Sequence, residues 1–510
     1  MKTYLGIEFG STRIKAVQIN EDFKVHSSGD YTWQSKFENG VWTYEMDEAI
    51  KGLKIALSTI KNRESVSAIG VSGMMHGYLA FDKNWNLLVP FRTWQNTITS
   101  KAADELTALF DFNIPQRWSI AHLYQAILNG EEHVKDIAHI TTLAGYVHFL
   151  LTGVNAVGIG EASGIFPIDC KSADYNSCMM DKFNELISSY NLGWTLSNVL
   201  PKVLKAGNDA GRLTKAGAEI VDNMLEEGIP FAPPEGDAGT GMVATNSISA
   251  RTGNVSAGTS IFSMVVLENP LSKVYPEIDI VTTPDGKDVA MVHCNNCTND
   301  SNAWINVMKE CVNLFGSSPQ TGELYSKLYE KSLEGDDDCG GLLVCNYVAG
   351  EGITHIDSGI PLVLRKPDSR FTLANFLRAT LYSAISTLRI GMEILDAEGV
   401  KLDSLVGHGG FFKTKNVGQS YLASACNTPV TCMETAGEGG PYGMAILASY
   451  LHHENETLGE FLEKRVFKSI HKSISNPEKK VKDGFENYMQ DYKKMIMVEK
   501  SAVISFKEDE

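Results

Sequence analysis

The stretch Leu5-Gly6-Ile7-Glu8-Phe9-Gly10-Ser11-Thr12 decides the fold class of this chain. Its apolar part, from Tyr4 to Gly10, predicts a strand, and Ile14 to Ile19 predicts a second strand. Gly10-Ser11-Thr12-Arg13 lies between them, so the pair is predicted to be a β-hairpin whose tip consists mostly of small residues.

A second copy of this hairpin occurs about half a chain later. Thr252 to Ser256 leads into Ala257-Gly258-Thr259-Ser260, and the apolar run Ile261 to Leu267 predicts the return strand. Two copies suggest duplicated halves, each supplying one phosphate-binding turn. The alternative is coincidence, because Gly-Thr-Ser between strands is common.

The segments around the first hairpin predict α/β architecture. Glu48 to Ile60 carries apolar residues at helical spacing, and Val66 to Val71 reads as a strand with glycines at its end. A chain of 510 residues is longer than one hydrophobic core usually supports. With the boundary placed just before Thr252, we expect an N-terminal domain over 1–250 and a C-terminal domain over 251–510.

Composition limits the partners. The formal charge of −17 repels nucleic acid and anionic lipid surfaces, although a small anionic ligand needs only local donors or a metal. We find no secretory signal and no apolar run long enough to span a membrane. Nine dispersed cysteines fit reduced thiols, so we expect a cytoplasmic protein.

The two hairpin tips are candidate phosphate sites. Phosphoryl oxygens are bound by backbone N–H groups in a concavity, and glycine lets the backbone approach closely. Either tip alone is equally well explained as a tight turn. Neither matches the Gly-x-x-x-x-Gly-Lys-[Ser/Thr] loop, and Gly6 to Gly10 lacks the spacing of a dinucleotide fingerprint.

Asp237 is the candidate catalytic residue. It follows Pro233-Pro234-Glu235-Gly236, read as a turn, and opens the small-residue helix expected over Ala238 to Ala244. There it could accept a proton from a substrate hydroxyl. Its alternative role is to cap that helix.

Two further segments suit a polyol. His76, in Gly73-Met74-Met75-His76-Gly77, could hydrogen-bond its hydroxyls, and Trp94-Gln95-Asn96-Thr97 offers an aromatic face and amides. A packed structural role is the alternative for both segments.

Glycines and cysteines supply the remaining candidates. Glycine pairs at Gly409-Gly410 and around Gly439 and Gly443 could let a nucleoside lie against the backbone, or could serve close packing. Cys294 and Cys297, with His293, provide too few ligands for a structural zinc, so we interpret them as structural.

In their order along the chain, these motifs resemble those of the FGGY family of carbohydrate kinases, within the sugar kinase, heat-shock ATPase and actin superfamily. The resemblance covers essentially the whole chain. The matching motifs are Leu5 to Thr12 and Gly258 to Ser260 for phosphate, Leu150 to Gly153 with Glu161 to Gly164, Gly236-Asp237 for the catalytic Asp, Met75-His76-Gly77 of the xylulokinase branch, and Gly409-Gly410 with Gly439 and Gly443 for adenosine.

The resemblance implies transfer of the γ-phosphoryl of ATP to a sugar hydroxyl with Mg²⁺, and it points to a ketopentose such as D-xylulose as the acceptor. It implies two actin-like (ribonuclease H-like) α/β domains around a central cleft, with sugar mainly on the first and nucleotide mainly on the second. The implied roles are Asp237 as base; Glu8 and Asp237 for the metal; Gly10, Ser11, Thr12, Arg13, Gly258, Thr259 and Ser260 for phosphates; Met75, His76, Trp94, Asn96 and Asp237 for the sugar; and Gly409, Gly410, Phe411, Gly439 and Gly443 for adenosine. The implied partners are a sugar and ATP, with no nucleic acid and no membrane, and a homodimer is left open.

Three departures from the family pattern stand out. Glu8 replaces the usual Asp, and Asn96 lies where xylulokinases generally carry an Asp. The polar stretch of Asn295, Asn296, Asn299 and Asp300 has no counterpart with a known role.

Other functions stay open at this point. They are FGGY activity on ribulose, a deoxyketose or another polyol, an ATPase or regulator that needs no sugar, and a redox or metal protein built on Cys294 and Cys297.

Overall fold

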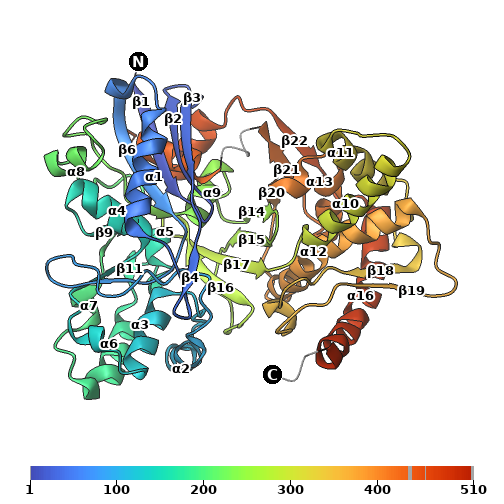
Figure 1. Cartoon of the computed structure of the whole chain (residues 1–510), viewed down its shortest axis with the longest axis horizontal. Coiled ribbons are helices and arrows are strands. Elements are labelled where there is room, and N and C mark those ends of the chain that lie inside the picture. Colours follow the sequence, from blue (N-terminus) through green and yellow to red (C-terminus); the bar gives the residue numbers. More distant parts are fainter. Residues whose placement is uncertain (1, 435–438, 454, 507–510) are drawn as a thin grey trace. The chain divides into compact units, whose positions relative to one another are not determined.

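The computed structural model describes residues 2–434, 439–453 and 455–506 and divides the chain into two compact units. The first contains Met1–Ser249, Lys273–Val289 and Glu438–Ile470, and the second contains Ala250–Ser272, Ala290–Gly437 and His471–Glu510. Both units are mixed α/β structures (Figure 1). Among the residues that the structure describes, no helix combines the length and apolar character needed to cross a bilayer.

The elements of the first unit are β1 (Thr3–Phe9), β2 (Arg13–Asn20), β3 (Val25–Thr32), β4 (Lys36–Glu38), β5 (Val41–Thr43), α1 (Met46–Ser58), β6 (Val66–Gly73), β7 (Leu79–Phe81), α2 (Ser100–Phe110), α3 (Ser119–Leu128), β8 (His139–Thr141), α4 (Leu143–Thr152), β9 (Ala156–Gly158), α5 (Ile159–Ala162), β10 (Ile168–Asp169), β11 (Asp174–Tyr175), α6 (Ser177–Ile187), α7 (Leu196–Val199), β12 (Lys202–Leu204), α8 (Lys215–Ile220), β13 (Glu235–Gly236), α9 (Asp237–Ala244), β16 (Ile278–Thr282), α14 (Gly440–Tyr450) and α15 (Leu458–Phe461).

The elements of the second unit are β14 (Thr252–Ala257), β15 (Ile261–Val266), β17 (Asp288–Cys294, which begins in the first unit), α10 (Asn299–Leu314), α11 (Thr321–Ser332), β18 (Leu342–Cys345), β19 (Leu362–Arg365), α12 (Leu373–Ala397), β20 (Ser404–His408), α13 (Val417–Ala425), β21 (Val430–Met433), β22 (Lys472–Ser475) and α16 (Lys479–Phe506).

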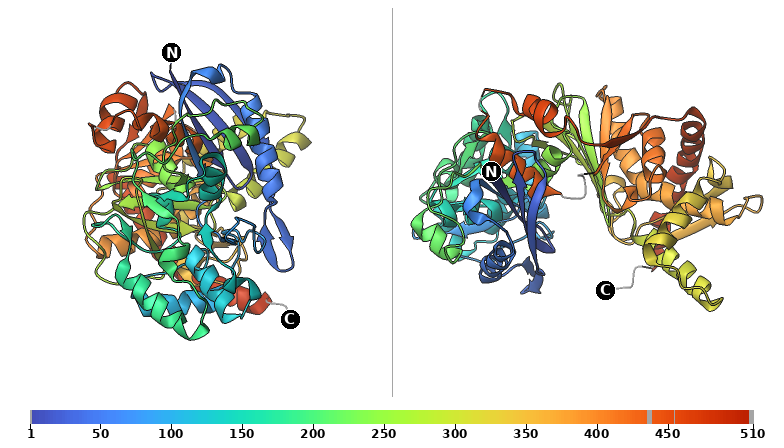
Figure 2. Two further views of the ribbon diagram at one scale, coloured as in Figure 1. Left: turned by 90° about the vertical axis from the view of Figure 1, so that its left-hand side faces the viewer. Right: turned by 90° about the horizontal axis from the view of Figure 1, so that it is seen from above.

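The first unit is built on a five-stranded sheet in the order β13-β6-β1-β2-β3. β1 pairs antiparallel with β2 and parallel with β6, so the predicted hairpin and the predicted strand after α1 are confirmed. Figure 2 shows these strands side by side in two further views. The segment predicted as a turn before Asp237 instead contains β13, which pairs parallel with the end of β6.

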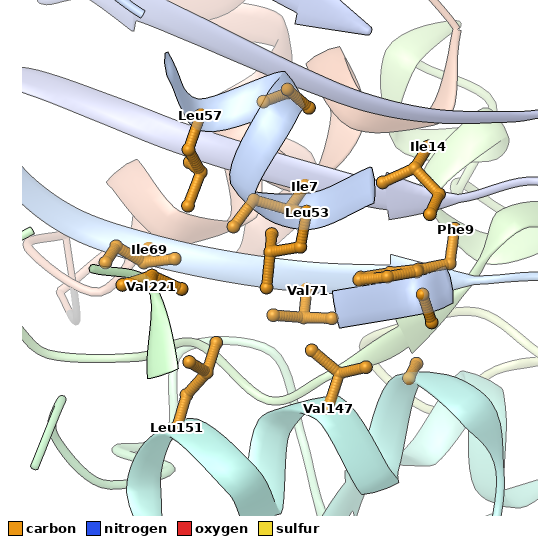
Figure 3. Packing of buried hydrophobic residues seen from close by; sticks show 14 of the residues in the cluster. Ile7, Phe9, Ile14, Leu53, Leu57, Ile69, Val71, Val147, Leu151 and Val221 are labelled. Carbon is orange, nitrogen blue, oxygen red and sulfur yellow. The ribbon is translucent and has the colours of Figure 1, made fainter. Parts of the chain in front are cut away.

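The two faces of β1 carry different side chains because successive residues of a strand point to opposite sides. Ile7 and Phe9 are fully buried in the core with residues of α1 and α4, including Leu53 and Val147 (Figure 3). Gly6 lies on the opposite face, where a Cβ atom would come within 2.0 Å of a backbone oxygen of α14. Glu8 shares that second face with Gly6.

The second unit repeats the hairpin. β14 pairs antiparallel with β15 and parallel with β20. The main sheet of this unit contains its strands in the order β17-β15-β14-β20-β21-β22, and β18 and β19 form a separate pair. The predicted strands around Gly258 to Ser260 are therefore confirmed. Its longest helices are α12 and α16.

Candidate active site

The tip of the first hairpin is held by aromatic side chains. The Gly10 N–H donates to the Arg13 carbonyl at 2.9 Å and closes the turn. Trp33 Nε1 donates to the Gly10 carbonyl at 2.7 Å, and the Tyr44 hydroxyl donates to the Ser11 carbonyl at 2.6 Å. Sequence reasoning missed Trp33 and Tyr44, because nothing near them indicates that their side chains reach this turn.

Asp237 is the first residue of α9, and it does not act as the usual N-cap. The capping position is Gly236, and no side-chain cap bond is formed there. The Asp237 carboxylate is exposed, and its Oδ1 accepts the N–H groups of Met75 at 3.2 Å and Ala238 at 2.9 Å. The protein packed around the carboxylate raises its pKa above the ordinary value, while these two N–H groups lower it. Such a carboxylate is oriented and can accept a proton.

Met75 and His76 lie beside Asp237. His76 is 5% exposed and has a φ of 73°, a conformation that non-glycine residues rarely adopt and that often marks functional sites. His76 Nδ1 lies 3.3 Å from the carbonyl of Gly164. Because a carbonyl only accepts, Nδ1 is the donor in this contact. The Glu161 to Gly164 motif therefore supports the histidine.

Glu8 extends from β1 toward the start of α14. Its Oε2 lies so close to Gly440 that a Cβ there would be 1.6 Å away, and its Oε1 lies near Gly10. Burial and the charge of Asp237 raise the pKa of Glu8 to about 8, and Lys15 opposes this shift. The longer Glu side chain is accommodated because residue 440 has no side chain.

Trp94 and Asn96 differ in what they can offer a ligand. Trp94 is 37% exposed, and its indole N–H donates to Ser11 Oγ at 3.1 Å, which connects it to the first hairpin tip. Asn96 is 2% exposed, and its amide donates to the carbonyls of Trp42 and Thr93 while it accepts the Trp42 N–H. Both amide protons of Asn96 are thus used within the protein.

Two buried carboxyl groups, Glu235 and Glu161, lie near Gly236 and Met75. Neither was predicted to be a site residue from the sequence. Glu235 is 1% exposed and accepts the N–H groups of Gly160 and Glu161 at 3.4 and 2.9 Å, and burial raises its pKa to about 8. Glu161 is fully buried, and neither of its oxygens has a hydrogen-bond partner of normal geometry among the described residues. Burial raises the pKa of Glu161 well above its usual range, which favours the protonated form of this carboxyl group.

The second unit presents its own turn. The Gly258 N–H donates to the Ser260 carbonyl at 2.9 Å, and Thr259 is exposed. Gly409 has a φ of 101°, and a Cβ there would lie 2.4 Å from the carbonyl oxygen of Ala257, directly before the turn. Gly409 and Gly410 are exposed, so an open glycine backbone lies beside the second turn.

The other residues predicted to bind adenosine are placed differently. Phe411 is fully buried and packs on Phe412 and Tyr329 inside the second unit. Gly439 and Gly443 belong to the first unit. Gly443 is buried, because α14 packs so closely on α9 that a Cβ would lie 2.0 Å from a backbone oxygen.

The cysteine alternative finds no support in the geometry. Cys294 and Cys297 are buried, and burial raises the pKa of both thiols, which disfavours the thiolate needed for redox chemistry or metal binding. Among residues 2–434, 439–453 and 455–506, no group of three or more His, Cys, Asp or Glu side chains could hold a metal ion.

Known proteins show the same organisation. Residues 3–244 match the N-terminal domain of the FGGY family of carbohydrate kinases, and residues 253–452 match its C-terminal domain. The chain is 25% identical over 492 residues to a xylulose kinase of Haemophilus influenzae, covering 90% of this chain and 92% of the relative.

Solved structures share the fold at low identity. A xyloylose kinase from Brucella ovis has a TM-score of 0.80 at 17% identity, covering 97% of this chain and 99% of the other. A gluconate kinase from Lactobacillus acidophilus has a TM-score of 0.81 at 15% identity, covering 99% and 100%. These likenesses confirm the predicted α/β fold of two actin-like domains. Since the two family models together match most of its length, the chain belongs to the FGGY family of carbohydrate kinases, phosphotransferases that phosphorylate a sugar hydroxyl with ATP.

Proposed function

We propose that this enzyme phosphorylates a ketopentose, with D-xylulose as the first candidate. One observation carries the proposal: the Met75 N–H bonds the carboxylate of Asp237, which places Met75-His76 beside the candidate base. The xylulose kinase of Haemophilus influenzae supports the same acceptor. The fold alone does not select it, because a gluconate kinase shares that fold.

In the proposed reaction, Asp237 accepts the proton of the attacking sugar hydroxyl as the oxygen bonds to the γ-phosphorus of ATP and ADP leaves. His76 forms a hydrogen bond with a second hydroxyl and so orients the sugar. Trp94 offers an exposed aromatic face to the C–H groups of the sugar. Asn96 contributes indirectly in this scheme, by fixing the Trp94 segment to the β5 region.

The turns at Gly10 to Arg13 and Gly258 to Ser260 bind the phosphates in this proposal. The first domain, 1–250, holds the sugar, and the second, 251–510, holds the adenosine beside Gly409 and Gly410. Aromatic support of the first turn and the exposed glycine backbone of the second are the observations in favour.

The carboxylates of Glu8 and Asp237 in the first unit are suitable ligands for Mg²⁺. This ion is usually held by one or two carboxylates together with substrate phosphates, and Glu8 and Asp237 offer such a pair. Asp237 raises the pKa of Glu8, so a cation between the two would relieve their repulsion. When bound, Mg²⁺ supplies positive charge to the transferring phosphoryl group.

A panel of acceptors with coupled detection of ADP tests the proposal. It contains D-xylulose, D-ribulose, a deoxyketose, gluconate and glycerol, with ATP alone as the blank. We expect the highest kcat/KM with D-xylulose. A higher value with another acceptor would replace the proposed substrate. ATP turnover that no sugar increases would instead indicate an ATPase or regulator.

A further inference from the structure

The stretch from Asn295 to Thr298, which includes two of the asparagines singled out in the sequence, packs against the turn Gly258 to Ser260 of the second unit. It joins β17 to α10. The Cys297 N–H donates to the Thr259 carbonyl at 3.0 Å. The Gly258 carbonyl accepts both the N–H of Thr298 at 3.1 Å and its hydroxyl at 2.8 Å. Two successive carbonyls of the turn are thus held by two successive residues of the stretch.

These bonds fix the direction of the N–H groups in the turn. In a trans peptide the carbonyl and the following N–H point in opposite directions. When the carbonyls of Gly258 and Thr259 point toward Cys297 and Thr298, the N–H groups of Thr259 and Ser260 point away from that stretch. Backbone N–H groups aligned in this way form an anion-binding concavity.

Thr298 is used in an unusual way for its position. It is the N-cap residue of α10, where a threonine hydroxyl ordinarily accepts an N–H of the helix's first turn. Here no side-chain cap bond is formed, and the hydroxyl donates to the phosphate turn instead. Thr298 is only 7% exposed. Helix α10 therefore lacks a side-chain cap at Thr298, and the Gly258 carbonyl is bound by the Thr298 hydroxyl.

Asn296 anchors the stretch to the loop after β18. Its Oδ1 accepts the N–H groups of Val348 and Ala349 at 2.9 and 3.0 Å, and its Nδ2 donates to the Ala349 carbonyl at 3.1 Å. Asn296 is 1% exposed, so these bonds are shielded from water. Asn346 adds a bond from its Nδ2 to the Cys297 carbonyl at 2.8 Å.

Glu351 completes this anchor. Its Oε2 accepts the backbone N–H groups of Asn295 at 3.0 Å and Asn296 at 3.3 Å and the side-chain amide of Asn296 at 3.2 Å. Glu351 is 1% exposed, and its Oε1 has no hydrogen-bond partner among the described residues. The three bonds from Asn295 and Asn296 lie on one oxygen, so a glutamine carbonyl could accept them.

We propose that Thr298, Asn296 and Glu351 are positioning residues for the phosphates of ATP, because they orient the N–H groups of the turn at Gly258 to Ser260. The inference rests on the proposed phosphate-binding role of this turn. None of the three residues needs to touch the nucleotide.

The sharpest test is Thr298→Val, which keeps the β-branched shape and removes only the hydroxyl. Thr380→Val is the matched control, since Thr380 is 3% exposed and its hydroxyl donates to the Leu377 carbonyl within α12. We expect Thr298→Val to raise KM for ATP and Kd for ADP roughly 3- to 10-fold, the range for one lost hydrogen bond. KM for the sugar, Kd for adenosine and Tm should match those of Thr380→Val.

Calorimetric binding of ADP and adenosine separates this inference from the proposed function, because neither ligand requires a sugar acceptor. Unchanged ADP affinity in Thr298→Val would overturn the inference, even if D-xylulose proves to be the substrate. Equal weakening of ADP and adenosine would also overturn it, because adenosine has no phosphate.

Glu351 gives a second, independent readout. Glu351→Ala should weaken ADP at least as much as Thr298→Val, while Glu351→Gln should restore affinity to within about twofold of wild type, because one acceptor oxygen suffices. Equal losses in both Glu351 variants would contradict the proposed geometry. If Glu351→Ala does not fold, Thr298→Val decides the question.

Discussion

Replacing Glu351 with glutamine should change how the stability of the protein depends on pH. Burial raises the pKa of Glu351 to about 7 from an ordinary value of 4.5, against the opposing effect of the N–H groups around its Oε2. A carboxyl group with a raised folded-state pKa stabilises the fold while it is protonated. That contribution is fully present below about pH 4.5 and is lost as the pH rises through 7.

The size of the effect follows from the pKa difference. One pKa unit corresponds to about 1.4 kcal/mol, so full titration of Glu351 costs at most about 3 kcal/mol of unfolding free energy between pH 4.5 and 8. Glutamine does not titrate and retains an acceptor oxygen for Asn295 and Asn296. Relative to wild type, Glu351→Gln should therefore gain stability by about 2–3 kcal/mol on going from pH 5 to pH 8.

Urea unfolding at pH 5, 6, 7 and 8 measures this difference for wild type and variant side by side. Glu310→Gln provides the control, because Glu310 is an exposed carboxylate of α10 in the same unit. A difference between Glu351→Gln and wild type that stays constant over this range would refute the reasoning. A fall in the stability of Glu351→Gln relative to wild type as the pH rises would give the linkage the opposite sign.

Two further predictions concern the first unit. Gly6→Ala should lower the unfolding free energy by about 1–3 kcal/mol, because the added Cβ would come within 2.0 Å of the Pro441 carbonyl oxygen. Gly322→Ala is the control, because its Cβ would enter open space and should leave Tm almost unchanged. Equal Tm shifts in the two variants would contradict the close packing at Gly6. Trp94→Phe and Ser11→Ala each remove the hydrogen bond between the Trp94 indole and the Ser11 hydroxyl. Their effects on kcat/KM should therefore be non-additive by about 0.5–1 kcal/mol in a double-mutant cycle. Strict additivity would show that this bond does not contribute to kcat/KM.

The sequence predicted those hairpins and helices whose pattern is contained in one short segment of the chain. Short apolar runs bounded by small-residue turns predicted both hairpins, and apolar periodicity predicted α1 because a buried helical face repeats along one segment. Gly236-Asp237 was expected to open a helix, and it does. The predicted roles of the site residues stay predictions.

The features that were missed depend on contacts between distant segments. Nothing in the neighbourhood of Trp33 indicates that its indole reaches Gly10, and nothing near Gly443 places α14 against β1 and α9. The bonds from Thr298 to Gly258 join residues 40 positions apart. Burial such as that of Phe411 is equally non-local, because neighbouring chain segments exclude the water.

The central claim is that Asp237 is the base of a sugar phosphorylation, and Asp237→Asn tests it most directly. Asparagine keeps the size of the side chain and an acceptor oxygen for the N–H groups of Met75 and Ala238 but cannot take up the proton. Phosphorylation of the best acceptor, followed by ADP release, should fall by about 10²- to 10⁴-fold, while the variant remains folded and binds ATP. A folded Asp237→Asn enzyme with near-wild-type turnover would contradict the account.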